Sequence, residues 1–299
     1  MNNLLSFSKP AKIWEEALPI GNGRLGAMIY SGTKELVMQM NEISLWNGCP
    51  FPDSDRKEAY KHLPALRQLI CDKKYSEAAK LLDKEFTNYG GGFEAAYCGS
   101  YQTFGELKIS FPKRLCKISD YSRKLDIAEA VCYDSFVSNG VRINREYFSS
   151  AVSDAVFVKI DASQKGFLNL DLSYSLNYIE KFAVSEDGFA FSGHCDGDSS
   201  HMAFAAKLRI KLFGGSAECS KSTLHIRNAD SIILCYTAAT DYVPDASVNF
   251  KSGIPSEKCS NIINAIDLSD YETANDAEVA ACNEALESCP VQAIGDDGE

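Results

Sequence analysis

Four side chains in two short stretches of the chain have the chemistry needed to contact a sugar: Asn41, Glu42, Trp46 and Gln102. The indole ring of a tryptophan offers a flat apolar plate against which a sugar ring can lie. The side-chain amides of Asn41 and Gln102 each carry donors and an acceptor, so each can bond two neighbouring hydroxyl groups. These four residues are the candidates for proximity to a glycan substrate.

A structural role for the same residues is the alternative. Large aromatic side chains are buried on average, so Trp46 could instead fill the edge of a packed sheet. Asn41 and Glu42 would then hold a turn. Both roles could hold in a complete enzyme in which this part of the chain packs on a second domain.

Three glycines in the same region fit a dinucleotide-binding pattern. Gly21, Gly23 and Gly26 match G-x-G-x-x-G, which requires a strand before it and a helix that begins inside it. We expect Pro19 to break any preceding strand, and residues 27–30 (AMIY) have the composition of a strand. The pattern therefore predicts a glycine turn and no bound nucleotide.

Other acids and potential metal ligands in the chain do not form a recognisable site. The adjacent carboxylates Glu15 and Glu16, and the nearby pair Asp53 and Asp55, are interpreted as solvated surface groups. The densest group of potential metal ligands consists of His194, Cys195, Asp196, Asp198 and His201. Its spacing fits no structural zinc site, so no metal and no cofactor is expected.

The elements that must position these side chains are mostly strands. Apolar and polar residues alternate in about a dozen short segments separated by turn residues, as in a large β-sandwich. Asn139-Gly140 between two of them is a strong hairpin signal. The expected strands cover residues 25–30, 36–40, 105–111, 123–127, 131–136, 141–148, 155–160, 167–174, 189–192, 203–212, 223–226 and 231–240.

One segment has helical spacing instead. Residues 54–86 place leucines on one face at intervals of three and four, with Pro64 tolerable only where it opens the helix. Ser76 is the expected N-cap of a second helix. Residues 87–100 (TNYGGGFEAAYCGS) form a glycine-rich loop that is long enough to be functional.

Six motifs in order resemble the start of glycoside hydrolase family 95, the inverting α-L-fucosidases. The resemblance covers roughly residues 10–266. The motifs are residues 14–48 (beginning WEEALPIGNGRLG), 74–78 (KYSEA), 101–107 (YQTFGEL), 121–126 (YSRKLD), 145–150 (REYFSS) and 237–242 (TAATDY). The resemblance implies a mainly β fold, a large antiparallel β-supersandwich with a helical insertion near residues 54–86.

The same resemblance implies that the catalytic groups lie elsewhere. Family members carry them in an (α/α)₆ barrel that follows this domain, where an acid and a base stand ~6.5–9.5 Å apart. Nothing after Tyr242 resembles such a barrel, so no catalytic residue is assigned. The implied partners are a fucosylated glycan and a catalytic barrel domain that is missing from this chain.

Charge divides the chain into a balanced body, residues 1–266, and an acidic tail, residues 267–299. The tail holds ten acids, and no Lys or Arg follows Lys258. The body has no basic stripe for nucleic acid and no apolar run near the ~20 residues of a membrane span. With no signal-peptide pattern and eleven scattered cysteines, the sequence predicts a cytoplasmic protein with reduced thiols. An export signal lost from an incomplete chain would give the same pattern.

The tail resembles the end of a single-cluster bacterial ferredoxin over residues 280–294. In that family Cys289, followed by Pro290, would be the last iron ligand and Cys282 an accessory cysteine. The other ligands come from a C-x₂-C-x₂-C run, and this chain has no C-x₂-C. We therefore expect no cluster on this chain, and interpret the tail as foreign to the body or as a plain acidic amphipathic helix.

Two functions stay open. The chain is either the N-terminal domain of an α-L-fucosidase, inactive by itself, or a non-catalytic sandwich that binds glycans. An exposed apolar patch where a barrel would dock favours the first. A shallow groove lined by Trp46 and Tyr101, with a polar docking face, favours the second.

Overall fold

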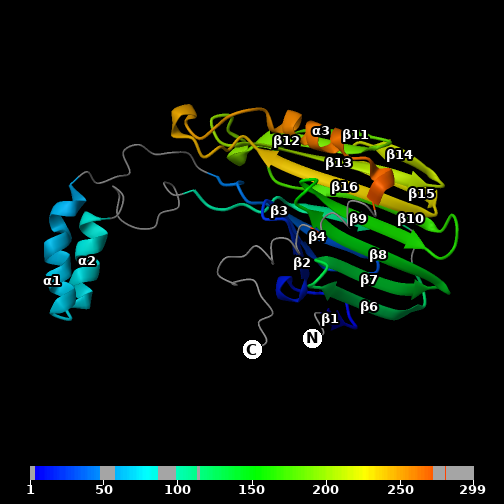
Figure 1. Cartoon of the computed structure of the whole chain (residues 1–299), viewed down its shortest axis with the longest axis horizontal. Coiled ribbons are helices and arrows are strands. Elements are labelled where there is room, and N and C mark those ends of the chain that lie inside the picture. The colour runs from blue at the N-terminus through cyan, green and yellow to red at the C-terminus, as the bar shows by residue number, and fades with distance from the viewer. Residues whose placement is uncertain (1–3, 48–57, 87–98, 113–114, 272–279, 281–299) are drawn as a thin grey trace.

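Two antiparallel sheets of nine and seven strands make up most of the molecule (Figure 1). The computed structural model describes residues 4–47, 58–86, 99–112, 115–271 and 280. The expected fold class, mainly β with two large antiparallel sheets and a few helices, is confirmed.

The strands of each sheet follow an order that differs from their order in the sequence. The nine-stranded sheet runs β1 (Leu4–Phe7), β6 (Ile118–Asp126), β7 (Val131–Ser138), β8 (Val141–Ser150), β9 (Ala155–Ala162), β16 (Ser231–Thr240), β13 (Ala203–Phe213), β12 (Gly188–His194) and β11 (Ile179–Ser185). The seven-stranded sheet runs β14 (Ser216–Ser220), β15 (Thr223–Ala229), β10 (Leu168–Ser175), β5 (Glu106–Ser110), β4 (Glu35–Glu42), β3 (Leu25–Ile29) and β2 (Leu18–Gly21). Sequence neighbours are mostly spatial neighbours, as in hairpin-connected folds.

The strongest turn signal of the sequence forms the hairpin that it predicts. Asn139 and Gly140 connect β7 to β8 with φ angles of 53° and 83°. Two positive φ angles in succession are typical of a type I′ turn, which matches the twist of the flanking strands. Ser138 pairs with Val141 directly across it, so the register of the hairpin is set at the turn.

The four strands that the sequence analysis did not single out, β1, β2, β11 and β14, are the four sheet edges. The expectation that Pro19 excludes a strand is wrong, because Pro19 lies within β2 and pairs with Met28 of β3. An edge strand tolerates proline because one side of it needs no ladder hydrogen bond. Gly21 pairs with Gly26 in this hairpin, and the chain enters β3 where a nucleotide site would need a helix.

The main core lies between the sheets and consists of side chains from the inner positions of both. On β4 these are Leu36, Met38 and Met40, which are buried while the residues between them are not. This alternation is the period-2 pattern that the sequence shows. One buried ion pair interrupts the apolar interior, with Arg145 Nε 2.6 Å from Asp134 Oδ1.

A second core covers the outer face of the nine-stranded sheet. Helix α3 (Pro255–Ala265) lies over β13 and β16 (Figure 1) and is followed by a 3₁₀ turn, η5 (Leu268–Asp270). Ile263 of α3, together with Leu268 and Tyr271, packs on apolar side chains of that sheet. The first residues of the acidic segment 267–299 therefore pack against the body. The rest of that segment, with Cys282 and Cys289, lies outside the described residues apart from Ala280.

The helical insertion consists of α1 (Leu63–Cys71) and α2 (Tyr75–Glu85), preceded by the short turn η2 (Ala59–His62). The pair stands to one side of the sheets in Figure 1. Pro64 lies in the first turn of α1, as expected. The prediction that Ser76 caps α2 is wrong, because the helix begins at Tyr75 and its N-cap, Lys74, makes no side-chain cap bond. Most of the glycine-rich loop 87–100 lies outside the described residues.

The remaining helical turns are short. They are η1 (Trp14–Glu16), η3 (Cys195–Gly197) and η4 (Ala246–Val248). Among the described residues, no helix combines the length and apolar character that crossing a membrane requires.

Candidate functional site

Two of the four candidate residues are neighbours on β4 and point to opposite faces of the seven-stranded sheet. Glu42 is 2% exposed and continues the row of inner residues that includes Met40. Asn41 lies on the outer face. Because successive strand residues alternate between faces, the two side chains cannot act on the same ligand from one side of the sheet.

The Glu42 carboxylate is engaged in bonds that hold the end of β4. Its Oε2 accepts from the backbone N–H of Ser44 at 2.8 Å and from the Ser44 hydroxyl at 2.7 Å. Its Oε1 lies 3.4 Å from Nη1 of Arg24. These bonds agree with the alternative in which Glu42 holds a turn. Because both carboxylate oxygens are engaged, little of the group is free to bind a ligand.

Arg24 extends this network to the other sheet. Its Nε donates to Asp154 Oδ1 at 2.7 Å, and its Nη2 donates to the Thr237 hydroxyl at 3.2 Å. Charge-assisted bonds of this kind are short and directional. The turn that carries residues 42–46 is therefore fixed against both sheets.

Asn41 and Trp46 meet on the outside of the sheet through a third residue, Tyr101. The Tyr101 hydroxyl donates to Asn41 Oδ1, and the Tyr101 ring meets the Trp46 ring edge-on with centroids 5.6 Å apart. Partial burial raises the pKa of Tyr101 above its ordinary value, so the phenol is protonated and able to donate at neutral pH. Trp46 is 46% exposed, so its indole is a surface group and does not plug the sandwich edge.

Exposed apolar side chains continue on both sides of this contact. Tyr101 lines a hollow of 330 Å³ on the outer face of the sheet, and Trp14 stands at the same hollow. Trp46 lines a hollow of 590 Å³ above Glu42 and Arg24. We call the exposed members of this surface the aromatic ridge; they are Trp14, Ile43, Trp46, Tyr101 and Tyr242. Both tryptophans of the chain belong to it, and a contiguous exposed patch of this kind marks an interaction surface.

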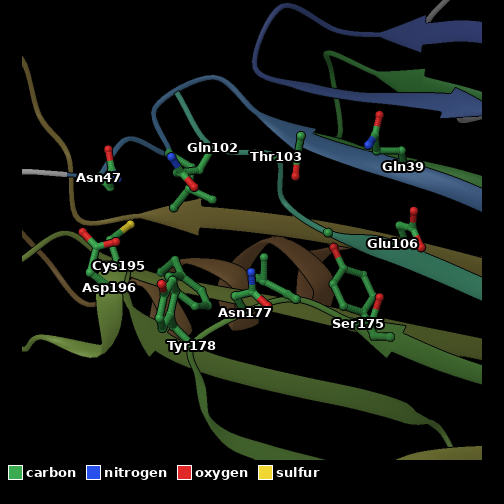
Figure 2. Close-up of a pocket in the computed structure, with 15 residues that line it drawn as sticks. Gln39, Asn47, Gln102, Thr103, Glu106, Ser175, Asn177, Tyr178, Cys195 and Asp196 are labelled. Carbon is green, nitrogen blue, oxygen red and sulfur yellow. The ribbon is translucent and has the colours of Figure 1, made fainter. Parts of the chain in front are cut away.

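Gln102 belongs to a different hollow. Its backbone N–H donates to Leu45 O at 2.9 Å, and its side-chain amide donates to Ser100 O at 3.2 Å. The side chain lines a polar pocket of 390 Å³ at which the segments 102–106 and 175–178 face each other (Figure 2). The structure therefore brings Asn41 and Trp46 together, buries Glu42 beneath them, and places Gln102 in a separate pocket.

The residues that the sequence grouped as potential metal ligands are paired separately. His194 Nδ1 lies 2.9 Å from Glu180 Oε1, and His201 Nδ1 lies 3.1 Å from Asp196 Oδ2. Asp198 accepts from the backbone N–H of Ser200, and this bond holds the pKa of Asp198 below its ordinary value. The described part of the chain contains no cluster of three His, Cys, Asp or Glu side chains arranged to bind a metal ion.

A serine, a histidine and an aspartate form a hydrogen-bonded chain on the outer face of the seven-stranded sheet. Ser220 Oγ lies 2.7 Å from His225 Nε2, and His225 Nδ1 lies 2.7 Å from Asp171 Oδ1. Arg227 also donates to Asp171 Oδ1, at 2.9 Å. Nucleophilic catalysis needs a bound electrophile and oxyanion donors besides such a chain. None of the three hollows described above is lined by these residues, so we interpret them as a surface ion-pair network.

The sequence analysis did not select Trp14, Asn177 or Tyr178, which line the hollows described here. One signal was available for Trp14, because it is one of only two tryptophans in the chain. Asn177 and Tyr178 follow a predicted strand, and nothing local to them indicates that they face Gln102. That proximity follows from the antiparallel pairing of β10 with β5, which sets Ser175 opposite Glu106.

Comparison with known proteins places the chain in a family of N-terminal domains of glycosyl hydrolases. Residues 5–245 match the family described as "Glycosyl hydrolase family 65, N-terminal domain". "Alpha-L-fucosidase 2" of Arabidopsis thaliana is 26% identical over 293 residues, which span 89% of this chain and 34% of that protein. "Probable alpha-fucosidase A" of Aspergillus niger is 27% identical over 290 residues, which span 84% of this chain and 34% of that protein.

The expected relation to α-L-fucosidases is confirmed by these relatives, and the chain spans about a third of their length. A solved structure, "Putative kojibiose phosphorylase from human microbiome", aligns with a TM-score of 0.49 at 10% identity. The alignment covers 95% of this chain and 38% of that one.

Proposed function

Because this chain belongs to the glycosyl hydrolase family 65 N-terminal domain family, we propose that it serves as the N-terminal β domain of an enzyme that hydrolyses α-L-fucosides with inversion. The observation that carries the proposal is its homology, over most of its length, to about a third of the length of proteins named as fucosidases. The catalytic acid and base belong in this proposal to a helical barrel outside the 299 residues, with the two groups ~6.5–9.5 Å apart.

The aromatic ridge supports the proposal as the surface on which the barrel packs. Trp14, Trp46 and Tyr242 are exposed, whereas large aromatic side chains are buried on average. The turn behind the ridge is fixed by Glu42 and Arg24, so the surface is rigid before anything binds to it. Rigid apolar anchors lower the conformational cost of association.

A non-catalytic glycan-binding sandwich is the second candidate. The observation that favours it is the contact of Trp46 and Tyr101 beside Asn41, which sets an indole plate next to a side-chain amide. A sugar face could stack on the indole while the amide bonds its hydroxyls. A cytoplasmic location remains part of the proposal under either candidate, and the seven cysteines described as free thiols support it.

The experiment is to incubate the purified chain with an α-1,2-fucosylated oligosaccharide and to measure released fucose, with the Arabidopsis relative as the positive control. We expect no release by the chain alone. Fucose release would show that an active site exists within these residues and would contradict the proposal.

A hybrid tests the domain role directly. In it this chain replaces the N-terminal third of the Arabidopsis protein, and we expect more fucose release than from the truncated relative. Titration of a glycan into the chain alone tests the second candidate. A glycan-binding sandwich requires that the chain binds the glycan and that Trp46→Ala abolishes this binding.

A further inference from the structure

The polar pocket of 390 Å³ that contains Gln102 has a lining suited to one sugar ring. Figure 2 shows Gln102 and Thr103 on one side of it and Asn177 and Tyr178 on the other. The lining offers side-chain amides and hydroxyl groups as donors and acceptors, and the carboxylates of Glu106 and Asp196 as further acceptors. Groups of this kind converging on a concavity indicate a binding site for a small polar ligand.

The backbone at the pocket is held in an unfavourable conformation. Tyr178 has φ of 65°, a left-handed value that is a genuine outlier for a bulky residue. Asp196, on the neighbouring wall, has φ of 57°. Residues held in sparsely populated regions persist only where the surroundings impose them, and they cluster at binding sites.

Two glycines allow neighbouring backbone to approach this segment closely. A Cβ at Gly193 would collide with the backbone oxygen of Tyr178, and a Cβ at Gly105, which itself has φ of 82°, would collide with the backbone oxygen of Ser175. The loop 175–178 is therefore packed against backbone at both ends. Its conformation leaves the Tyr178 ring 49% exposed at the mouth of the pocket.

The charge of the lining selects among possible ligands. Among the described residues that line the pocket, Glu106 and Asp196 are acids and none is a Lys or Arg. Lys108 bonds Glu106 at 2.9 Å without being part of the lining. Carboxylates accept hydrogen bonds from sugar hydroxyls but repel anionic ligands.

We propose that this pocket binds one ring of a neutral saccharide, with Tyr178 against the face of the sugar and the amides of Gln102 and Asn177 bonding its hydroxyls. The pocket uses residues of this chain alone, so the inference goes beyond the role as the N-terminal domain of a hydrolase. It assigns a function to the left-handed backbone at Tyr178, whose ring is exposed at the mouth of the pocket.

The decisive variant is Tyr178→Gly, which removes the ring and suits the left-handed backbone. The probe is a neutral α-1,2-fucosylated trisaccharide, titrated into the full chain by calorimetry alongside thermal unfolding. We expect affinity to fall about tenfold or more, since stacking on one aromatic ring contributes on that order. The melting temperature should stay the same or rise, which separates lost binding from lost folding.

Three further arms complete the test. Gln102→Ala should also weaken binding, and Ile127→Ala, at the exposed turn between β6 and β7, should leave the affinity unchanged. Galactose should bind better than galacturonate, because the second adds a carboxylate beside two acids. Retained affinity in Tyr178→Gly, loss of affinity in Ile127→Ala, or no binding of any neutral saccharide at about 10 mM would each overturn the proposal. None of these outcomes bears on whether the hybrid enzyme releases fucose, so the two proposals fail separately.

Discussion

Of two apolar surfaces on the outside of this sandwich, one is covered by the chain itself and the other is exposed to solvent. On the outer face of the nine-stranded sheet, Phe148 and Phe157 stack with ring centroids 4.8 Å apart and are covered by α3 and Tyr271. At the β2–β3–β4 end of the seven-stranded sheet, Trp14 and Trp46 of the aromatic ridge are open to solvent. Both surfaces are rich in aromatic residues, and only the first is covered by a described segment of the same chain.

The covered surface is buried by a later segment of the same chain. Tyr271 meets Phe148 edge-on at 5.3 Å, and its hydroxyl donates to Glu146 at 2.9 Å. The result is a small second core with a polar anchor at its rim. The ridge has the same apolar character, and no described segment covers it, which makes it the surface on which the proposed domain role depends.

The largest expected effect follows from removing a ring of the covered surface. Phe157→Ala should lower the free energy of unfolding by about 3–5 kcal/mol, because it leaves a cavity among Phe148, Ile233 and Tyr271. Urea unfolding followed by circular dichroism measures the change. Phe157→Leu is the matched control and should lose less than about 1.5 kcal/mol, since it keeps most of the volume. Equal losses in both variants would argue against a closely packed second core.

A smaller effect is expected at the polar anchor of the same surface. Tyr271→Phe keeps the ring on Phe148 and removes only the hydroxyl that bonds Glu146, so the loss should be about 1 kcal/mol. Thermal unfolding of the variant beside Glu146→Gln measures it. A loss as large as that of Phe157→Ala would mean that the hydroxyl, and not the ring, holds segment 266–271 on the sheet.

The ion-pair network of Asp171, His225 and Arg227 should contribute still less to the free energy of unfolding, and only above acidic pH. Burial raises the pKa of Asp171, but the bonds from His225 and Arg227 outweigh it and hold the pKa below its ordinary value of 3.8. A carboxylate with a lowered folded-state pKa stabilises the fold above the unfolded value. That contribution is lost as the pH falls from about 4 through the folded value.

Asp171→Asn tests this contribution. The variant should be less stable than the parent at pH 7 by about 0.5 kcal/mol, since the pair is partly exposed. The difference should shrink as the pH approaches 3. A constant difference across that range would show that the loss comes from packing and not from charge. Unfolding curves at a series of pH values measure it.

The fold was predictable where burial on one or both faces leaves a pattern in the sequence. Central strands such as β4 and β16 carry that pattern, and the hairpin at Asn139 and Gly140 carries its own turn chemistry. Edge strands carry a weaker burial pattern, since β11 and β14 are mostly exposed and Pro19 lies within β2. The start of α2 was misplaced because its N-cap, Lys74, uses no side-chain bond.

The candidate site was predictable in its residue types and not in its arrangement. Asn41 and Glu42 were both named as candidates for proximity to a glycan, and strand alternation sends Asn41 outward and Glu42 into the interior. Gln102 was placed with Trp46 because no sequence pattern reports which hollow a loop residue faces. Its actual neighbours, Asn177 and Tyr178, come from a segment more than seventy residues away, which the pairing of β10 with β5 brings near.

The smallest expected effect on stability belongs to the open surface. Trp14 is 54% exposed, so Trp14→Ala should change the free energy of unfolding by no more than about 0.5 kcal/mol, even though the side chain is larger than Phe157. The same change should reduce self-association at high concentration, measured by sedimentation velocity, because it removes an exposed apolar anchor. A loss approaching that of Phe157→Ala would mean that the ridge stabilises this chain itself, and the contrast between the two surfaces would disappear. Unchanged stability with lower self-association would instead mark the ridge as a surface shaped for a partner.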